Sequence, residues 1–193
     1  MYYLPKQEIY DGIADCCLEG FDKNLSLRDI LELAWETIGD FPMHCPEHHY
    51  LMAGSLLAVY SRLNGDDRNK LVNWLREAQN RAKNVLGGFC GFYGACGAAV
   101  GAGIFLSIFK SVTPLVKENW QETTGITAAC LQQISDLGGP RCCKRVCYTT
   151  ARAVAAYMAE HYRLIAEMPE DINCLRYEKN SECIKEDCPY YRQ

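Results

Sequence analysis

The chain has 193 residues, of which 49% are hydrophobic, and a formal net charge of -4. This length fits one domain, and the apolar content is enough to bury a core without disulfide bonds. Nucleic-acid-binding proteins usually carry a basic surplus, so the acidic balance argues against a nucleic-acid partner.

Cysteine is the residue type in clearest excess, with 12 copies in the chain. The opening segment MYYLPKQEIYDG has no apolar run of the kind found in signal peptides. We therefore expect a cytoplasmic, reducing environment. There, dense cysteine indicates metal or iron–sulfur ligation and thiol chemistry before it indicates a disulfide framework.

Apolar residues recur at helical spacing along most of the chain, and no run alternates for long enough to predict a sheet. Ser26 is a typical helix cap, Pro46 suits a first turn, and glycines end several segments. The predicted helices cover 5–18, 26–38, 46–63, 71–85, 95–110, 115–137 and 141–167. We therefore predict an all-α fold, a single helical domain of about seven helices within residues 1–168.

One stretch, 85–109, has no charged residue and could be mistaken for a membrane span. Its many glycines weaken both helix propensity and transfer into lipid. The first half of the stretch is typical of a loop. We predict a buried helix after a glycine-rich turn, and no membrane partner.

The composition changes in residues 169–193, which are polar and hold Cys174, Cys183 and Cys188 in the pattern C-x8-C-x4-C-P. Because this tail is too polar to fold by burial alone, metal ligation is a natural way to order it. A proline after the last cysteine also occurs in ferredoxin cluster loops. A fourth ligand must come from the body, solvent or substrate. A disordered tail with incidental cysteines and a redox disulfide remain as alternatives.

Five further cysteines lie at or near predicted helix starts, where free N–H groups favour a thiolate. Basic residues at 141, 144 and 145 strengthen this effect for the last helix. Glycines near the fifth helix would let the backbone approach a cofactor, although Gly97 and Gly101 would also allow tight helix packing. The cysteines are Cys45, Cys90, Cys96, Cys142 and Cys143, and the basic candidates are Arg141, Lys144 and Arg145. We expect Gly91, Gly94, Gly97 and Lys144 to bind a cofactor, and Cys45, Cys90, Cys96 and Arg141 to take part in catalysis.

Three histidines gather around one of these cysteines in the sequence His44-Cys45-Pro46-Glu47-His48-His49. The pairs 44/48 and 45/49 are four residues apart, which places two ligands on one helix face. The absence of His-Glu-x-x-His argues against a zincin peptidase. We expect His44 to be a metal ligand, and His48 or His49 to be an acid or base, since histidine titrates near neutral pH.

The remaining candidates have structural explanations. Four cysteines lack a basic or histidine partner nearby or lie on a buried helix face, and we assign them to the core. His161, on the expected inner face of the last helix, is predicted to be a hydrogen-bonded core histidine. The core cysteines are Cys16, Cys17, Cys130 and Cys147.

Over residues 40–190 the chain resembles an uncharacterised family of small cysteine-rich proteins, a domain of unknown function, from anaerobic bacteria and archaea. The motifs that carry the resemblance are HCPEHH at 44–49, GFCGFYGACGA at 88–98, GPRCCKR at 139–145 and CPY at 188–190. The resemblance implies the cytoplasm of an anaerobe and similarity to families with oxygen-sensitive cofactors. It implies no particular reaction.

These observations predict an iron–sulfur or other metal-dependent enzyme acting on a small molecule in redox or sulfur chemistry. Cys174, Cys183 and Cys188 would hold a [4Fe–4S] cluster whose fourth iron is open or bound by Cys142 or Cys143. The histidine block, Cys90, Cys96 and the cluster would share one site. Zinc is the alternative metal.

Two other classes stay open. One is a non-catalytic zinc or thiol-metal module, such as a sensor, metallochaperone or assembly factor. The other is a dithiol oxidoreductase using Cys90 and Cys96 or the Cys142–Cys143 pair, although the chain has no C-x-x-C motif. Surplus apolar helix faces also make a homodimer possible.

Overall fold

The computed structural model describes residues 4–191, and every element of regular secondary structure in that range is a helix. The prediction of an all-α fold is therefore confirmed. The α-helices are α1 (Gln7–Asp22), α2 (Leu27–Thr37), α3 (Glu47–Leu63), α4 (Arg68–Ala82), α5 (Phe89–Phe92), α6 (Gly97–Phe109), α7 (Trp120–Leu137) and α8 (Cys143–Tyr162), followed by two 3-10 turns, η1 (Tyr177–Lys179) and η2 (Lys185–Asp187).

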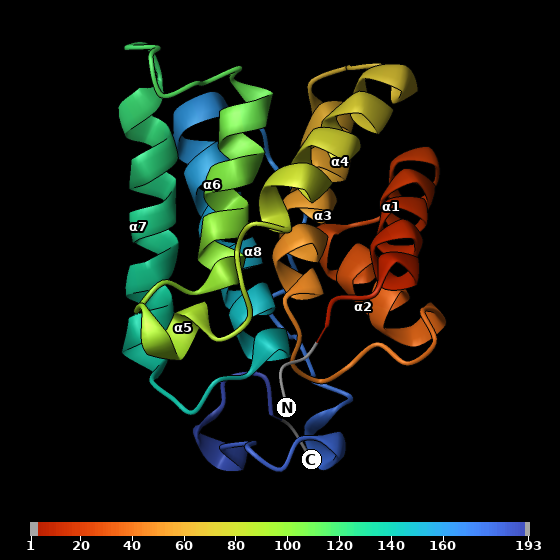
Figure 1. Cartoon of the computed structure of the whole chain (residues 1–193), viewed down its shortest axis with the longest axis vertical. Helices are drawn as coiled ribbons and strands as arrows, with labels where there is room; N and C mark the ends of the chain where they lie inside the picture. The colour runs from red at the N-terminus through yellow and green to blue at the C-terminus, as the bar shows by residue number, and fades with distance from the viewer. Residues whose placement is uncertain (1–3, 192–193) are drawn as a thin grey trace.

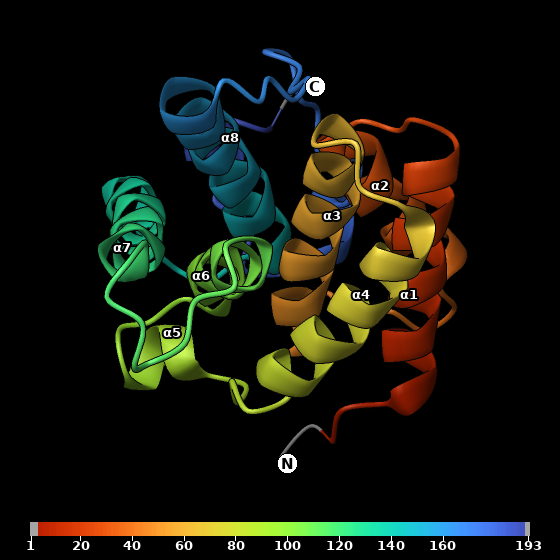
Figure 2. The same cartoon turned by 90° about the horizontal axis from the view of Figure 1, so that it is seen from above.

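Helix α3 forms the centre of the molecule, with α1, α2 and α4 on one side and α6, α8 and α7 on the other (Figures 1 and 2). Its sequence is apolar around most of its circumference, and such a helix is stable only when neighbours cover it on all sides. Close packing against α6 depends on Gly101, where an added Cβ would lie 2.7 Å from the carbonyl oxygen of His49. The packing role predicted for Gly101 is confirmed.

Helix α6 corresponds to the apolar stretch that could be mistaken for a membrane span. It has 13 residues and lies against α3 and α7. Within residues 4–191, no helix combines the length and the apolar character that crossing a membrane would require. The prediction of a buried helix is confirmed, although the preceding turn also contains the short exposed helix α5.

Helix α8 ends earlier than its apolar periodicity predicts. Arg163 adopts a left-handed conformation with φ 59°, and the Leu164 N–H bonds to the Met158 carbonyl, which ends the helix. No glycine marks this end in the sequence. Ile165 lies beyond this end and is exposed. His161, in the last turn of α8, is also exposed, so the prediction that it is a core histidine is wrong.

The tail returns along the bundle and then covers the end where α3, α6 and α8 begin (Figure 1). Arg176 reaches into the body and forms a buried ion pair with Glu32 of α2, with 2.6 Å between its nitrogen and the carboxylate oxygen. Tyr190 bonds to Thr149 of α8, and its carbonyl accepts the N–H of Cys174. Polar contacts with the body therefore contribute to ordering the tail, which its composition did not predict.

Candidate metal-binding site

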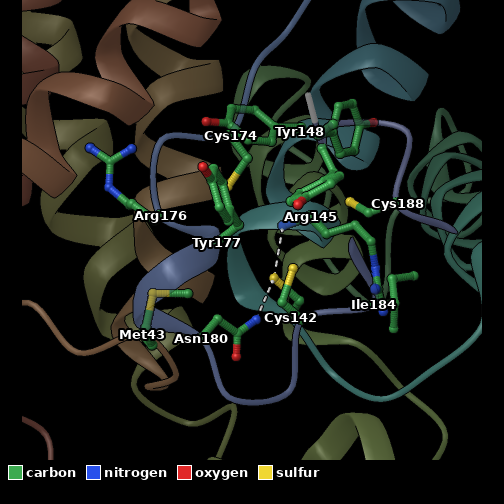
Figure 3. Close-up of a pocket in the computed structure, with 13 residues that line it drawn as sticks. Met43, Cys142, Arg145, Tyr148, Cys174, Arg176, Tyr177, Asn180, Ile184 and Cys188 are labelled. Carbon is green, nitrogen blue, oxygen red and sulfur yellow. Dashed lines mark hydrogen bonds between the residues drawn. The ribbon is translucent and has the colours of Figure 1, made fainter. Parts of the chain in front are cut away.

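A pocket between the tail and the start of α8 is lined by four cysteines. Cys142 is the N-cap residue of α8, and Cys174, Cys183 and Cys188 come from the tail. Figure 3 shows the labelled thiols of Cys142, Cys174 and Cys188 around this space. The structure thus brings together the three predicted tail ligands and Cys142, one of the two cysteines predicted to be the fourth ligand.

Two of these sulfurs accept backbone hydrogen bonds at well-defined distances. The Cys142 sulfur lies 3.5 Å from the Arg145 nitrogen in the first turn of α8, and 3.5 Å from the side-chain nitrogen of Asn180. The Cys183 sulfur lies 3.4 Å from the Lys185 nitrogen, where η2 begins. Donors aimed at a sulfur favour its charged thiolate form, which is the form that binds metals.

The other two tail sulfurs have the same kind of partner. Burial raises the pKa of Cys174, and a hydrogen bond from the Arg176 backbone opposes this rise. Burial likewise raises the pKa of Cys188, opposed by a hydrogen bond from the Tyr190 backbone. For Cys174, Cys183 and Cys188 the donor is the backbone N–H of the residue two positions after the cysteine in the sequence. Each of the four pocket cysteines therefore has its own backbone N–H donor.

Lys144, predicted to bind a cofactor, instead lies in the interior with 2% of its surface exposed. Its ammonium is 3.0 Å from the Pro42 carbonyl, 3.3 Å from that of Met43 and 2.9 Å from His48 Nε2. Burial lowers the pKa of Lys144. With three acceptors in place, this side chain fastens the segment before α3 to α8, and it does not line the four-cysteine pocket.

His48, a predicted acid or base, is 1% exposed and bonded on both ring nitrogens. Because the Lys144 ammonium donates to Nε2, the ring proton is on Nδ1, which lies 3.1 Å from the Cys45 carbonyl and 3.2 Å from its sulfur. Burial, and then the charge of Lys144, hold the pKa of His48 well below its usual range. The histidine is therefore neutral in the folded protein.

His49 points toward α6, away from His48. Its Nδ1 donates to the Val85 carbonyl at 2.9 Å, and burial lowers its pKa. The ring lies directly against Gly97, where an added Cβ would be 2.0 Å from the ring carbon Cδ2. Gly97 therefore approaches a histidine closely, and its predicted contact with a cofactor stays a prediction.

The prediction that helix starts lower the thiol pKa is wrong for three cysteines. Cys45, Cys96 and Cys143 do lie at the starts of α3, α6 and α8. Burial nevertheless raises the pKa of Cys45 and Cys96, and raises that of Cys143 to about 12. Removal from water outweighs the favourable field of the helix ends, so these three remain thiols.

His44 joins the histidine block to the pocket. Its Nε2 lies 3.2 Å from Asn180 Oδ1 and 3.7 Å from the carboxylate of Glu182. Arg141 lies 3.6 Å from the same carboxylate at the protein surface. His44 and Arg141 are thus close to the tail, but neither lines the pocket. Cys45, His48 and His49 do not line it either, so the predicted roles of these residues at a metal site stay predictions.

Cys90, Gly91 and Gly94 are exposed in and after α5, and no neighbouring atom lies within 4 Å of a Cβ built at either glycine. They do not line the four-cysteine pocket. Their predicted roles in thiol chemistry and cofactor binding stay predictions. The cysteines assigned to the core are all buried: Cys16, Cys17, Cys130 and Cys147.

The sulfurs of the pocket are not arranged around a single ion. Among residues 4–191, no group of three cysteine, histidine or acidic side chains is placed to hold one metal ion. Zinc bound by four thiolates at about 2.3 Å would require sulfurs only about 3.8 Å apart. In this conformation the pocket has a thiolate-type donor set without the geometry of a mononuclear site.

Three residues that shape the pocket were not predicted from the sequence. Asn180 bonds to Cys142, and the buried pair of Arg176 and Glu32 fixes the tail beside it. None belongs to a cysteine or histidine motif. The only signal available was an arginine and an asparagine among the tail cysteines, and sequence does not show which polar residues of a loop become buried.

The fold and the pocket define a small, all-helical, cysteine-rich protein with four thiols gathered at one end. The chain matches the model of a family described as "Family of unknown function (DUF5714)" over residues 16–191, and it belongs to that family. No curated protein and no solved structure matches the chain.

Proposed function

We propose that the four-cysteine pocket binds a metal centre, and that this centre is a [4Fe–4S] cluster. The observation that carries the proposal is that Cys142, Cys174, Cys183 and Cys188 line one pocket, each with a backbone N–H donor at its sulfur. Cysteine thiolates are the usual ligands of such clusters, and hydrogen bonds to the sulfurs set their reduction potentials.

The spacing of its ligands distinguishes a cluster from a single ion. A [4Fe–4S] cube binds each thiolate through a different iron, so its four ligands stand farther apart than those of one tetrahedral ion. The thiols would close on the cluster from α8 on one side and from the tail on the other.

The chemistry proposed is redox or sulfur chemistry on a small molecule, in the cytoplasm of an anaerobe. With all four cysteines as ligands, the cluster would supply electron transfer. Binding of a substrate directly to iron would need one ligand position to be open, and we assign that position to Cys142, the only one of the four cysteines that belongs to the body. An open iron would then act as a Lewis acid.

A non-catalytic zinc module is the second candidate. Four thiols are the ligand set of closed structural zinc sites, which keep no position for a substrate. This candidate requires the sulfurs to move together when the metal binds. It predicts a colourless protein with one zinc for each chain.

Anaerobic purification followed by iron, sulfide and zinc determination separates the two candidates. The cluster predicts about four irons and four acid-labile sulfides for each chain, with the broad visible absorption of iron–sulfur proteins. Stoichiometric zinc without sulfide would support the module instead. Protein without metal, before and after anaerobic reconstitution with iron and sulfide, would overturn both.

A further inference from the structure

Asn180 occupies an unusual position in the tail, between the proposed cluster ligands and the histidine block. Its side chain is 7% exposed, and its Nδ2 lies 3.5 Å from the Cys142 sulfur (Figure 3). Its Oδ1 accepts the Glu182 N–H at 3.1 Å and faces His44 Nε2 at 3.2 Å. One buried amide thus connects the tail backbone, a histidine and the cysteine contributed by α8.

The direction of each bond follows from the chemistry of the amide. A carbonyl oxygen only accepts, so both the Glu182 N–H and the His44 Nε2–H donate to Oδ1. These two bonds fix the amide plane and leave Nδ2 directed at the sulfur. Donation to Oδ1 also polarises the amide and strengthens Nδ2 as a donor, because hydrogen bonds in a chain reinforce one another.

Cys142 therefore differs from the three tail ligands. Cys142 accepts the Arg145 backbone N–H and, in addition, a side-chain donor from Asn180. A backbone donor persists in almost any variant, whereas a side-chain donor depends on one residue. Substitution of Asn180 can change the electrostatics at the Cys142 sulfur while leaving all four cysteines in place.

We infer that Asn180 is a positioning residue that holds the Cys142 ligand against the tail and raises the reduction potential of the proposed cluster. This inference rests on the proposed function. Reduction adds negative charge to the cluster and its thiolates, and an N–H donor stabilises the more negative state. Loss of the donor should therefore lower the potential.

Two substitutions separate the donor from the loop contacts. Asn180→Ala removes the whole amide, whereas Asn180→Asp keeps an oxygen for the Glu182 N–H and His44 but removes the N–H directed at Cys142. Lys179→Ala is the matched control, because Lys179 is the exposed neighbour of Asn180 in η1. The measurement is the midpoint potential of the reconstituted cluster, with iron and sulfide content determined on the same samples.

The inference predicts a lower potential in both Asn180 variants than in the wild type, and a wild-type potential in Lys179→Ala. The aspartate variant should show the larger shift, because its charge adds to the loss of the donor. If Asn180→Ala does not bind a cluster, the midpoint potential of Asn180→Asp alone tests the inference. If both fail to bind a cluster while Lys179→Ala loads normally, the claim about the potential is overturned, because loss of occupancy alone is what a purely structural asparagine would produce.

Equal potentials at equal cluster content in the wild type and a loaded Asn180 variant would overturn the inference, since a purely structural asparagine would change occupancy and not potential. That result would leave the proposed cluster intact. A wild-type protein that cannot be loaded with iron and sulfide would instead overturn the proposed function, and the role of Asn180 with it.

Discussion

Two groups of cysteines in this molecule differ in what surrounds the thiol. Cys17, Cys130 and Cys147 lie in the helical core with no exposed surface, and burial raises the pKa of each. The four pocket cysteines lie at the N-cap of α8 or in the tail, and each has a backbone N–H at its sulfur that opposes the effect of burial. The surroundings of a thiol therefore say more about a candidate ligand than the number of thiols in the chain.

The largest expected effect is the loss of the metal when a pocket cysteine is replaced. Cys174→Ser should reduce iron and sulfide to a small fraction of the wild-type content, because serine is a poor ligand for a cluster. Cys130→Ala should keep the wild-type content and lose about 1–2 kcal/mol of stability through its small cavity. Metal analysis and chemical denaturation measure the two effects. Equal metal content in the two variants would contradict the distinction between pocket and core cysteines.

The next largest effect is expected at the ion pair that fixes the tail. Arg176→Ala leaves the Glu32 carboxylate buried without its cation, which typically costs about 3–5 kcal/mol. Urea unfolding should show this loss, and limited proteolysis should cut the tail first. Lys185→Ala, at an exposed tail position, should change stability by less than about 0.5 kcal/mol. A stable Arg176→Ala protein with a protected tail would contradict the anchoring role.

A smaller effect is expected at the contact between α3 and α6. Gly97→Ala forces the His49 ring away from α6 and should cost about 1–3 kcal/mol. Gly91→Ala, in a position with open space around it, should be neutral or stabilising by up to about 1 kcal/mol. Thermal unfolding of the two variants compares them directly. The same melting temperature for both would show that the His49 ring does not need the glycine.

The smallest effect is a pH dependence of stability from the buried histidines. The pKa of His48 is lowered on folding, so below about pH 6.5 the unfolded state binds more protons and the free energy of unfolding falls. The slope for one such histidine is at most about 1.4 kcal/mol for each pH unit. His48→Gln should flatten this dependence. Urea titrations between pH 7 and 5 provide the measurement, and an identical slope in His48→Gln would refute the assignment.

Much of the helical architecture was predictable because each helix carries a local signal. Ser26 caps α2 through its bond to the Asp29 N–H, as its position in the sequence predicts. The end of α8 was not predictable, because Arg163 adopts a conformation that the sequence usually marks with glycine. Local patterns therefore identify the elements better than their ends.

The pocket was only partly predictable for a related reason. The three tail cysteines stood out by spacing and by their polar surroundings, and Cys142 by its place at a helix start. The separation of His48 and His49 from the pocket depends on long-range packing, with Lys144 on one ring and Gly97 on the other. Similarly, the effect of burial on Cys45 and Cys143 depends on how the helices assemble.

Site-resolved alkylation, read by mass spectrometry before and after metal removal, shows whether the four pocket cysteines bind one metal centre. We expect Cys142, Cys174, Cys183 and Cys188 to be protected together in the anaerobically loaded protein and to become reactive together when the metal is removed. The core cysteines should stay unreactive in both states. Pocket cysteines that react equally in both states, in protein shown to contain stoichiometric metal, would contradict their assignment as ligands.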